Sequence, residues 1–344
     1  MLTDDFDYEL PSGLIAQEPV HPRDACRLLV LDRSSGQTDH RRFSDILEYL
    51  RSDDLIVIND TKVLPARLRG VKADSDGAVE VLLLRERYTD AWECLVRPGR
   101  RLKPGAKIVI GDGRLTGLVV DVLEGSGARV VQFKTDHGSF IEAVHEFGEV
   151  PLPPYITRPI VDPADYQTVY ASDERSAAAP TAGLHFTQEL LAAVEERGAR
   201  IARVELDVGL DTFRPVSEDD PCDHVIHTER FRVSAATAAS VNATREACGR
   251  VIAIGTTTVR ALESAFDEEL GEVVATDADS DLYILPGFRF EVVNVMVTNF
   301  HIPRSTLLML VSAFAGREIV MRAYETAMEE RYRFLSFGDA MLIL

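Results

Sequence analysis

Short apolar runs alternate with amphipathic segments of helical length near the start of the chain and again over its second half. Short continuous apolar runs are typical of buried strands, whereas apolar positions recurring every three to four residues indicate helices. Strands are predicted at residues 27–31, 54–58, 200–208, 250–254 and 292–297. Helices are predicted at residues 43–50, 188–197, 235–247, 259–266, 307–314 and 324–332. This alternation predicts an α/β fold.

Residues 66–150 follow a different pattern. Short β-like runs at 79–84, 92–96, 107–110, 115–122 and 129–133 are separated by Gly, Asp and Pro, and a helical pattern returns only at 140–147. Regularly spaced short strands are typical of a small antiparallel barrel or sandwich. We therefore predict a small β-domain at residues 66–150, inserted into a larger α/β domain made of residues 1–65 and 151–344.

Composition narrows the class of protein. A chain of 344 residues with 46% hydrophobic content can bury a large core. Its acidic first residues do not resemble a signal peptide, and the apolar run 307–315 is too short to span a bilayer, so we expect a cytoplasmic protein without membrane attachment. The four cysteines stand singly, which favours neither a zinc knuckle nor a redox motif. They are Cys26, Cys94, Cys222 and Cys248.

The net charge of −19 is unevenly distributed. Residues 66–150 contain 13 basic and 13 acidic side chains, so the whole excess of negative charge lies elsewhere. The densest basic loop of the chain falls in this neutral segment and contains Arg97, Arg100, Arg101 and Lys103. Such a loop is either a solvated hairpin turn or, if the protein binds RNA, the contact for the phosphate backbone.

Polar residues follow three of the predicted strands. Asp60, Thr61 and Lys62 come after the strand ending at Ile58, and residues 255–258 (GTTT) come after the strand ending at Ile254. Thr298-Asn299-Phe300-His301 follows the third. Ligands of α/β proteins collect at the carboxyl edge of the sheet, so these ends predict a site. The Gly/Thr turn suits an anion but matches neither a P-loop nor a dinucleotide fingerprint.

A small, Gly- and Pro-punctuated segment, residues 179–187 (APTAGLHFT), precedes the predicted helix at 188–197. Thr187 is a candidate N-cap, which makes the segment a loop that brings His185 to a helix start. The alternative is a tight buried turn whose His185 bonds a backbone carbonyl.

Two further groups are candidates for chemistry. His224 and His227, with Glu229 two residues further on, could bind a metal only with a third ligand such as His185 or His301. Acid/base use of His227 or Glu229 is therefore more economical. The second group is Tyr155, Tyr166, Gln167 and Tyr170. Its aromatic rings could stack on a base or pack a domain interface.

Several segments of the sequence resemble motifs of one family and follow one another in the family's order. They are residues 7–11 (DYELP), 14–17 (LIAQ), 59–63 (NDTKV), 65–68 (PARL), 151–156 (PLPPYI), 166–170 (YQTVY), 179–187, 255–257, 259–260, 262–264, 298–301 (TNFH) and 338–341 (GDAM). The chain resembles the S-adenosylmethionine:tRNA ribosyltransferase-isomerases of queuosine biosynthesis, from about residue 4 to the C-terminus. The resemblance implies the same layout, a small β-barrel within a larger α/β domain.

The resemblance also implies a reaction. The ribosyl group of S-adenosylmethionine is transferred to 7-aminomethyl-7-deazaguanine at the wobble position of tRNA and isomerised, which gives epoxyqueuosine-tRNA, adenine and methionine. S-adenosylmethionine is consumed as a substrate, and no cofactor or metal is implied. The expected partner is tRNA with a GUN anticodon, and we expect a monomer.

This chemistry needs groups that move protons and groups that hold the substrates. Catalytic roles are predicted for His185, His227, Glu229 and Asp60. Substrate binding is predicted for Thr61, Lys62, Arg67, Tyr155, Gln167, Tyr170, Pro180, Thr181, Gly183, Thr256, Thr257, Arg260, Asn299 and His301. Thr256, Thr257 and Arg260 would hold the methionine carboxylate, and Asn299 and His301 would bind adenine or ribose.

The chain departs from the family pattern at a few positions. Asp207 and Asp211 stand where a histidine and a glycine are expected, and Cys26 stands where serine is usual. Two alternatives therefore stay open. One is a metal-dependent hydrolase that uses His185, His224, His227 and His301; the other is a tRNA-binding member of the family without catalysis.

Overall fold

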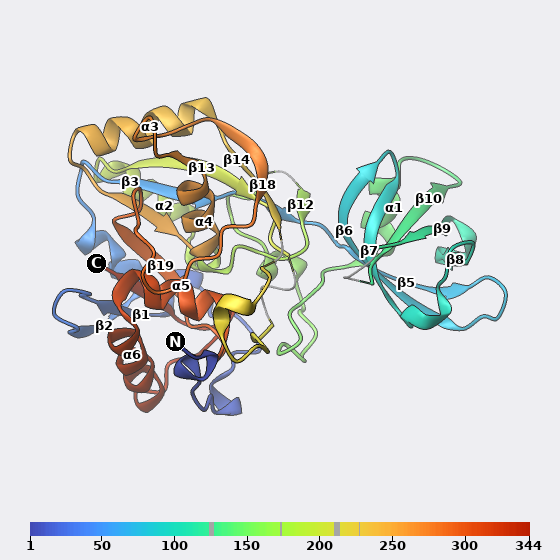
Figure 1. Cartoon of the computed structure of the whole chain (residues 1–344), viewed down its shortest axis with the longest axis horizontal. Helices are drawn as coiled ribbons and strands as arrows, with labels where there is room; N and C mark the ends of the chain where they lie inside the picture. Colours follow the sequence, from blue (N-terminus) through green and yellow to red (C-terminus); the bar gives the residue numbers. More distant parts are fainter. Residues whose placement is uncertain (124–126, 173, 210–213, 227) are drawn as a thin grey trace. The chain divides into compact units, whose positions relative to one another are not determined.

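The computed structural model describes residues 1–123, 127–172, 174–209, 214–226 and 228–344 (Figure 1). The chain forms two compact units. The larger comprises Met1–Lys62, Pro153–Asp173 and Ala179–Leu344, and the smaller comprises Val63–Leu152 with Glu174–Ala178. The predicted domain boundaries were 65/66 and 150/151, and they did not include the return of residues 174–178 to the smaller unit.

A nine-stranded mixed sheet forms the centre of the larger unit, in the order β18-β14-β13-β3-β15-β19-β20-β1-β2. Its inner strands β13, β3, β15 and β19 run parallel, whereas antiparallel strands continue the sheet on both sides. The strands are β1 (Arg27–Leu31), β2 (Thr38–Arg42), β3 (Leu55–Asn59), β13 (Arg200–Leu206), β14 (Glu229–Val233), β15 (Val251–Ile254), β18 (Thr276–Ser280), β19 (Val295–Asn299) and β20 (Ala340–Ile343). Each inner strand is a continuous or alternating apolar run, which explains why these segments lie in the buried centre.

Helices of the larger unit follow the apolar periodicity of the sequence. They are α2 (Gln188–Glu196), α3 (Ala235–Glu246), α4 (Thr256–Ser264), α5 (Thr306–Ala315) and α6 (Arg317–Glu329). The Thr187 hydroxyl accepts a hydrogen bond from the Leu190 amide at 3.1 Å, so the predicted N-cap of α2 is confirmed. The 3-10 helices η4 (Phe43–Tyr49) and η8 (Thr181–His185) pack beneath the sheet edge through the buried rings of Phe43 and Phe186.

The smaller unit is a closed antiparallel barrel in the order β5-β6-β7-β10-β9-β8, and β8 pairs back to β5. Its strands are β5 (Arg67–Lys72), β6 (Ala78–Tyr88), β7 (Ala91–Arg97), β8 (Lys107–Ile110), β9 (Leu115–Val122) and β10 (Arg129–Thr135). Helix α1 (Phe140–Phe147) begins with a capping box between Ser139 and Glu142. Its Phe140 ring stacks on Phe133, which places α1 against the barrel.

Several short elements complete the fold. The short strands are β4 (Lys62–Val63), β11 (Gly148–Glu149), β12 (Glu174–Ser176), β16 (Phe266–Asp267) and β17 (Glu272–Val273). The other 3-10 helices are η1 (Thr3–Phe6), η2 (Ser12–Leu14), η3 (Arg23–Ala25), η5 (Gly99–Arg101), η6 (Gly111–Gly113), η7 (Pro163–Tyr166) and η10 (Pro221–Asp223). Within the described residues, no helix is both long enough and apolar enough to cross a membrane.

The fold class is confirmed, and four predicted elements need correction. The strand predicted at 292–297 is β19, which begins at Val295 and ends at Asn299. Helix α4 begins at Thr256 rather than at residue 259, and α6 begins at Arg317 rather than at residue 324. The segment 43–50 is a 3-10 helix rather than an α-helix, and the side chain of Asp45 accepts from the Arg42 amide at its start.

Candidate active site

Three parallel strands bring the predicted polar ends to one edge of the sheet. Strands β3, β15 and β19 are neighbours, so the residues after Ile254 and Val297 meet beside the end of β3. A cavity opens at this edge, as the polar strand ends predicted. Its lining comprises Ala179, Pro180, Thr181, Ala182, Val208, Gly255, Thr256, Thr257, Thr298, Asn299, His301 and Leu307.

The start of α4 forms one wall of this first cavity. Gly255 has a φ of 91°, a left-handed conformation that glycine adopts readily, and it turns the chain from β15 directly into α4. The first amides of an α-helix have no partner within the helix, and they carry the positive end of its dipole. Thr256 and Thr257 therefore border the cavity on a helix terminus that suits an anion.

A second cavity adjoins the first and shares Thr181, Asn299, His301 and Leu307 with it. The remaining lining residues are Tyr155, Phe300, Ile302, Ser305, Leu335 and Ser336. The Tyr155 hydroxyl lies 2.7 Å from the Ser336 hydroxyl, which fixes this ring at the cavity wall. The apolar and aromatic lining, with a few hydroxyl and amide groups, is typical of a small-molecule site.

His301 stands between the two cavities. Its backbone is held on both sides, because its amide donates to the Tyr324 hydroxyl at 3.0 Å and its carbonyl accepts from the Tyr8 hydroxyl. The ring Nε2 lies 3.4 Å from the Thr298 hydroxyl, and Nδ1 has no hydrogen-bond partner. Burial lowers the pKa of His301 to about 3, so the imidazole is neutral near pH 7.

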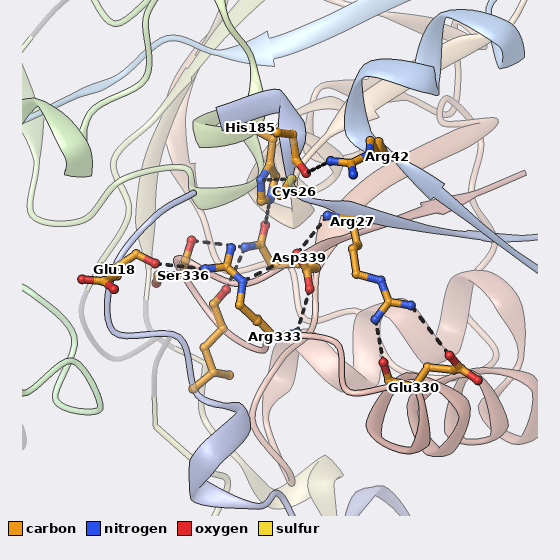
Figure 2. Close-up of polar contacts among 12 residues, drawn as sticks. Glu18, Cys26, Arg27, Arg42, His185, Glu330, Arg333, Ser336 and Asp339 are labelled. Carbon is orange, nitrogen blue, oxygen red and sulfur yellow. Dashed lines mark hydrogen bonds and ion pairs between the residues drawn. The ribbon is translucent and has the colours of Figure 1, made fainter. Parts of the chain in front are cut away.

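Both ring nitrogens of His185 have hydrogen-bond partners, and the residue lines neither cavity. Its Nδ1 lies 3.2 Å from the Cys26 sulfur (Figure 2). Its Nε2 lies 3.2 Å from Oδ1 of Asn299. The ring packs against Phe43 at a centroid distance of 5.0 Å. Burial lowers the pKa of His185 to about 4, which keeps the ring neutral. The partner of the buried imidazole is thus a side-chain amide, where the alternative interpretation expected a backbone carbonyl.

Tyr170 and Gly183 pack against each other in the core. A Cβ on Gly183 would lie 1.9 Å from the Tyr170 hydroxyl oxygen, so only glycine allows this contact. Tyr170 is 6% exposed, and its hydroxyl has no hydrogen-bond partner. Both residues therefore support the 181–185 segment from behind, and neither lines the two cavities.

Glu229 and Arg260 form a buried ion pair, with exposed fractions of 3% and 4%. Glu229 also accepts from the Gly209 amide at 2.9 Å, and Arg260 donates from Nε to the Leu282 carbonyl at 3.1 Å. The pair joins β14 to α4. Neither residue lines the cavities, although a catalytic role and carboxylate binding were predicted for them.

The end of β3 is tied to the end of β13 by Asn59, whose side chain the sequence interpretation did not single out. Its Nδ2 donates to the Leu206 carbonyl at 3.0 Å, and Oδ1 accepts from the Leu206 amide at 3.2 Å. The adjacent Asp60 is buried, accepts from Ser172 at Oδ2 and lies 3.5 Å from Arg203. Its Oδ1 has no hydrogen-bond partner. Burial raises the pKa of Asp60, and the interactions with Ser172 and Arg203 oppose this rise.

The remaining predicted residues are spread more widely. The Thr61 hydroxyl donates to the Leu206 carbonyl at 3.2 Å, Lys62 begins β4, and Gln167 directly follows η7. Arg67 belongs to the smaller unit, and His227 and Asp211 lie outside the described residues. The prediction missed Val208, Ser305, Leu307 and Ser336, because their place on the cavities depends on loops that carry no motif.

The described residues offer no geometry for the metal-dependent alternative, and His227, one of its four histidines, lies outside them. In the part of the chain that the structure describes, no three His, Cys, Asp or Glu side chains gather so that they could hold a metal ion. His185 contacts Cys26 and Asn299 instead, and His224 Nδ1 lies 3.0 Å from a carboxylate oxygen of Glu218.

The basic turn of the smaller unit (residues 97–103) exposes four cations. Arg97, Arg100, Arg101 and Lys103 are all exposed, and none forms an ion pair with the described residues. Elsewhere in this unit ion pairs are common; they involve Arg69, Lys72, Arg85, Arg87 and Arg114. The turn is held from inside by Arg129, which is 9% exposed. It donates to the Leu102 carbonyl at 2.7 Å and to the Gly99 carbonyl at 2.6 Å.

Comparison with known proteins gives one consistent result. Residues 3–343 match the family described as queuosine biosynthesis protein. Proteins of Symbiobacterium thermophilum and Moorella thermoacetica, both named S-adenosylmethionine:tRNA ribosyltransferase-isomerase, are 53% and 52% identical over the full length of both chains. The crystal structure of the S-adenosylmethionine tRNA ribosyltransferase of Thermotoga maritima is 40% identical, covers 99% of this chain and 100% of its own, and superposes with a TM-score of 0.56. The chain therefore belongs to the queuosine biosynthesis protein family.

Proposed function

We propose that this protein transfers the ribosyl group of S-adenosylmethionine to 7-aminomethyl-7-deazaguanine at the wobble position of tRNA and isomerises it. The products are epoxyqueuosine-tRNA, adenine and methionine. Full-length identity above one half to proteins named for this activity supports the assignment. The structural observation that carries it is the pair of adjoining cavities at the carboxyl edge of the sheet, with a helix terminus on one wall.

The first cavity fits the methionine end of the substrate. Thr256 and Thr257 lie in the first turn of α4, where free amides and hydroxyls can receive a carboxylate. This role does not need Arg260, whose charge is already paired with Glu229. The second cavity has the aromatic ring of Tyr155 and the side chains of Asn299 and His301, which suit a nucleoside. The substrate would thus extend along the sheet edge from α4 toward Ser336.

Proton transfer is the second requirement. The attacking amine must lose a proton, and a proton beside the sulfonium must be removed. Asp60 suits the amine, because its buried Oδ1 has no partner and burial raises its pKa toward that of a useful base. His227 keeps its predicted acid/base role as part of this proposal. Glu229 forms an ion pair with Arg260, and both ring nitrogens of His185 have hydrogen-bond partners. We therefore assign neither residue to proton transfer.

The tRNA would dock through the basic turn of the smaller unit. Unpaired arginines and lysines bind phosphates because their charge is not already neutralised by a neighbouring carboxylate. The turn meets this condition, whereas most of the surrounding barrel surface does not. The preference for a GUN anticodon, the monomeric state and the cytoplasmic location are further parts of the proposal and rest on the family resemblance.

Adenine release tests the proposal. The purified protein is mixed with S-adenosylmethionine and tRNA that carries 7-aminomethyl-7-deazaguanine, and unmodified tRNA serves as the control. We expect adenine only with the modified tRNA, together with a matching gain of mass on that nucleoside. A folded protein that binds tRNA but releases no adenine would contradict the proposal, and would identify a non-catalytic member marked by Asp207 and Asp211.

A further inference from the structure

The hydrogen bonds of Asn299 determine which way its amide points. Its Nδ2 lies 2.9 Å from the Leu335 carbonyl and 3.3 Å from the Ser336 carbonyl. Carbonyl oxygens can only accept, so the NH₂ group must face them, and a flipped amide would set oxygen against oxygen. Asp339 accepts from the Arg333 amide at 2.7 Å and from the Arg27 amide at 2.9 Å, which holds the same loop against β1 (Figure 2).

The orientation of Asn299 in turn sets the tautomer of His185. Oδ1 of Asn299 faces Nε2 of His185 at 3.2 Å, so this nitrogen must carry the hydrogen. Nδ1 is then the acceptor, and its neighbour at 3.2 Å is the Cys26 sulfur. Burial raises the pKa of the Cys26 thiol, which therefore keeps its hydrogen and can donate it. These contacts form one chain of hydrogen bonds with a fixed donor direction for each bond. It links Cys26, His185, Asn299 and the carbonyls of residues 335 and 336.

Every member of this chain is shielded from water. Cys26 is 3% exposed, His185 4% and Asn299 3%, and Asn299 is the member that lines both cavities. Both of its amide hydrogens are used, and one lone pair of Oδ1 is used by His185. The Asn299 side chain can therefore make one further hydrogen bond, as an acceptor through the second lone pair of Oδ1.

We infer that His185 is a positioning residue that fixes Asn299 as a hydrogen-bond acceptor for a donor group of the nucleoside, either a ribose hydroxyl or the exocyclic amine of adenine. The inference rests on the proposed function for the identity of the ligand. It excludes the ring nitrogens of adenine and the methionine carboxylate as partners of Asn299, because these groups only accept. A flipped amide would make the opposite choice, and His185 opposes the flip by donating to Oδ1.

Two variants separate positioning from proton transfer. His185→Gln keeps an N–H group that can donate to Asn299, whereas His185→Leu removes it at similar bulk. We expect the leucine variant to raise the KM for S-adenosylmethionine and its Kd by about tenfold, since one buried hydrogen bond is lost and Asn299 is freed to flip. Glutamine should restore most of this loss. In both variants the pH profile of kcat should keep both limbs between about pH 6 and about pH 9.

Loss of one limb of that profile in both variants would overturn the inference, because it would make His185 a proton carrier. An unchanged Kd in the leucine variant would overturn it as well. If the leucine variant fails to fold, the inference is tested on the wild-type protein with substrate analogues. Its Kd for S-adenosylmethionine is compared with its Kd for the 2′-deoxy, 3′-deoxy and N6-dimethyl forms. One of these should bind about tenfold more weakly, and equal binding of all of them would refute the assignment.

The same measurements separate this inference from the proposed function. Binding of S-adenosylmethionine without adenine release from modified tRNA would end the proposed function, while the Kd values of the variants would still decide the role of His185. Adenine release by the wild type with no change of Kd or KM in the leucine variant would end the inference alone. No binding of S-adenosylmethionine by the wild type would end both.

Discussion

The carboxylate of Glu229 pairs with the guanidinium of Arg260, and both side chains are almost completely buried. Removing one partner leaves the other charge buried and unpaired, which costs about 3–5 kcal/mol. Glu229→Gln should therefore lower the free energy of unfolding by about 3 kcal/mol, measured by urea denaturation, and the pH profile of adenine release by the folded fraction should not move. The pair thus fixes α4 rather than transferring protons.

The double variant Glu229→Gln/Arg260→Met provides the control for this prediction, because it removes both charges and should recover part of the lost stability. Arg230, which lies on β14 next to Glu229, forms an exposed ion pair with Asp277 of β18, at 2.8 Å. Arg230→Ala should cost less than about 1 kcal/mol. A stable Glu229→Gln variant that loses one limb of its pH profile would restore Glu229 as an acid or base.

Gly183→Ala should destabilise the 181–185 segment. The new Cβ would meet the Tyr170 hydroxyl at 1.9 Å and the Thr168 methyl at 2.9 Å, so the buried turn must shift. Overpacking of this kind costs about 1–3 kcal/mol. Thermal unfolding should show a lower Tm. Tyr170→Phe removes the atom of closest contact and should recover part of the loss in the double variant; a double variant no better than Gly183→Ala would contradict the contact.

Cys26 should control how well His185 holds Asn299. Cys26→Ala removes the donor to Nδ1, so the Nε2–H tautomer loses its support, and the KM for S-adenosylmethionine should rise several-fold. Cys26→Ser keeps a donor of the kind usual in the family, and its KM should lie below that of the alanine variant. Equal KM values for the two variants would show that the sulfur contact at 3.2 Å does not orient the ring.

Burial of neutral His185 should weaken the fold in acid. Its pKa is lowered to about 4 from an ordinary value of 6.5, so the unfolded state binds more protons between these two values. The contribution of His185 to stability therefore falls by about 2 kcal/mol as the pH drops to about 5, and His301, whose pKa burial lowers to about 3, adds a loss of the same sign. Urea unfolding at about pH 7.5 and about pH 5 measures the loss, which should be smaller in His185→Gln.

The apolar pattern predicted β1, β3, β13, β15 and β19, but it did not predict β14 or the fully buried β20. Residues 27–31 form β1 with the predicted bounds, because a continuous apolar run can only be buried. The edge strands β2 and β18 were missed, since their residues are mostly exposed and polar (TDHRR and TDADS) and show no periodicity. The start of α4 was also missed, because three threonines after a glycine resemble a turn, whereas the left-handed Gly255 completes the turn in one residue.

The candidate site could be located from the sequence but not assigned in detail. Polar residues after parallel strands predict a site at the sheet edge, and two cavities open at this edge. Which of these side chains reach a cavity depends on partners far along the chain. His185 contacts Cys26 and Asn299, which are 159 and 114 residues away, and no local pattern encodes such contacts.

Charge reversal of Arg100, Arg101 and Lys103 should weaken tRNA binding and make it less dependent on salt. With fewer phosphate contacts, tRNA binding releases fewer counterions. Filter binding between about 50 and about 200 mM salt measures both quantities. Reversal of Arg85, Arg87 and Lys134 changes the net charge of the same unit equally and is the matched control. Arg129→Met should lower the affinity without removing a surface charge, since the Gly99 and Leu102 carbonyls lose their buried donor and the turn loosens. Equal effects of the two triple reversals would mean that only the overall charge matters, and that the basic turn is not the docking site.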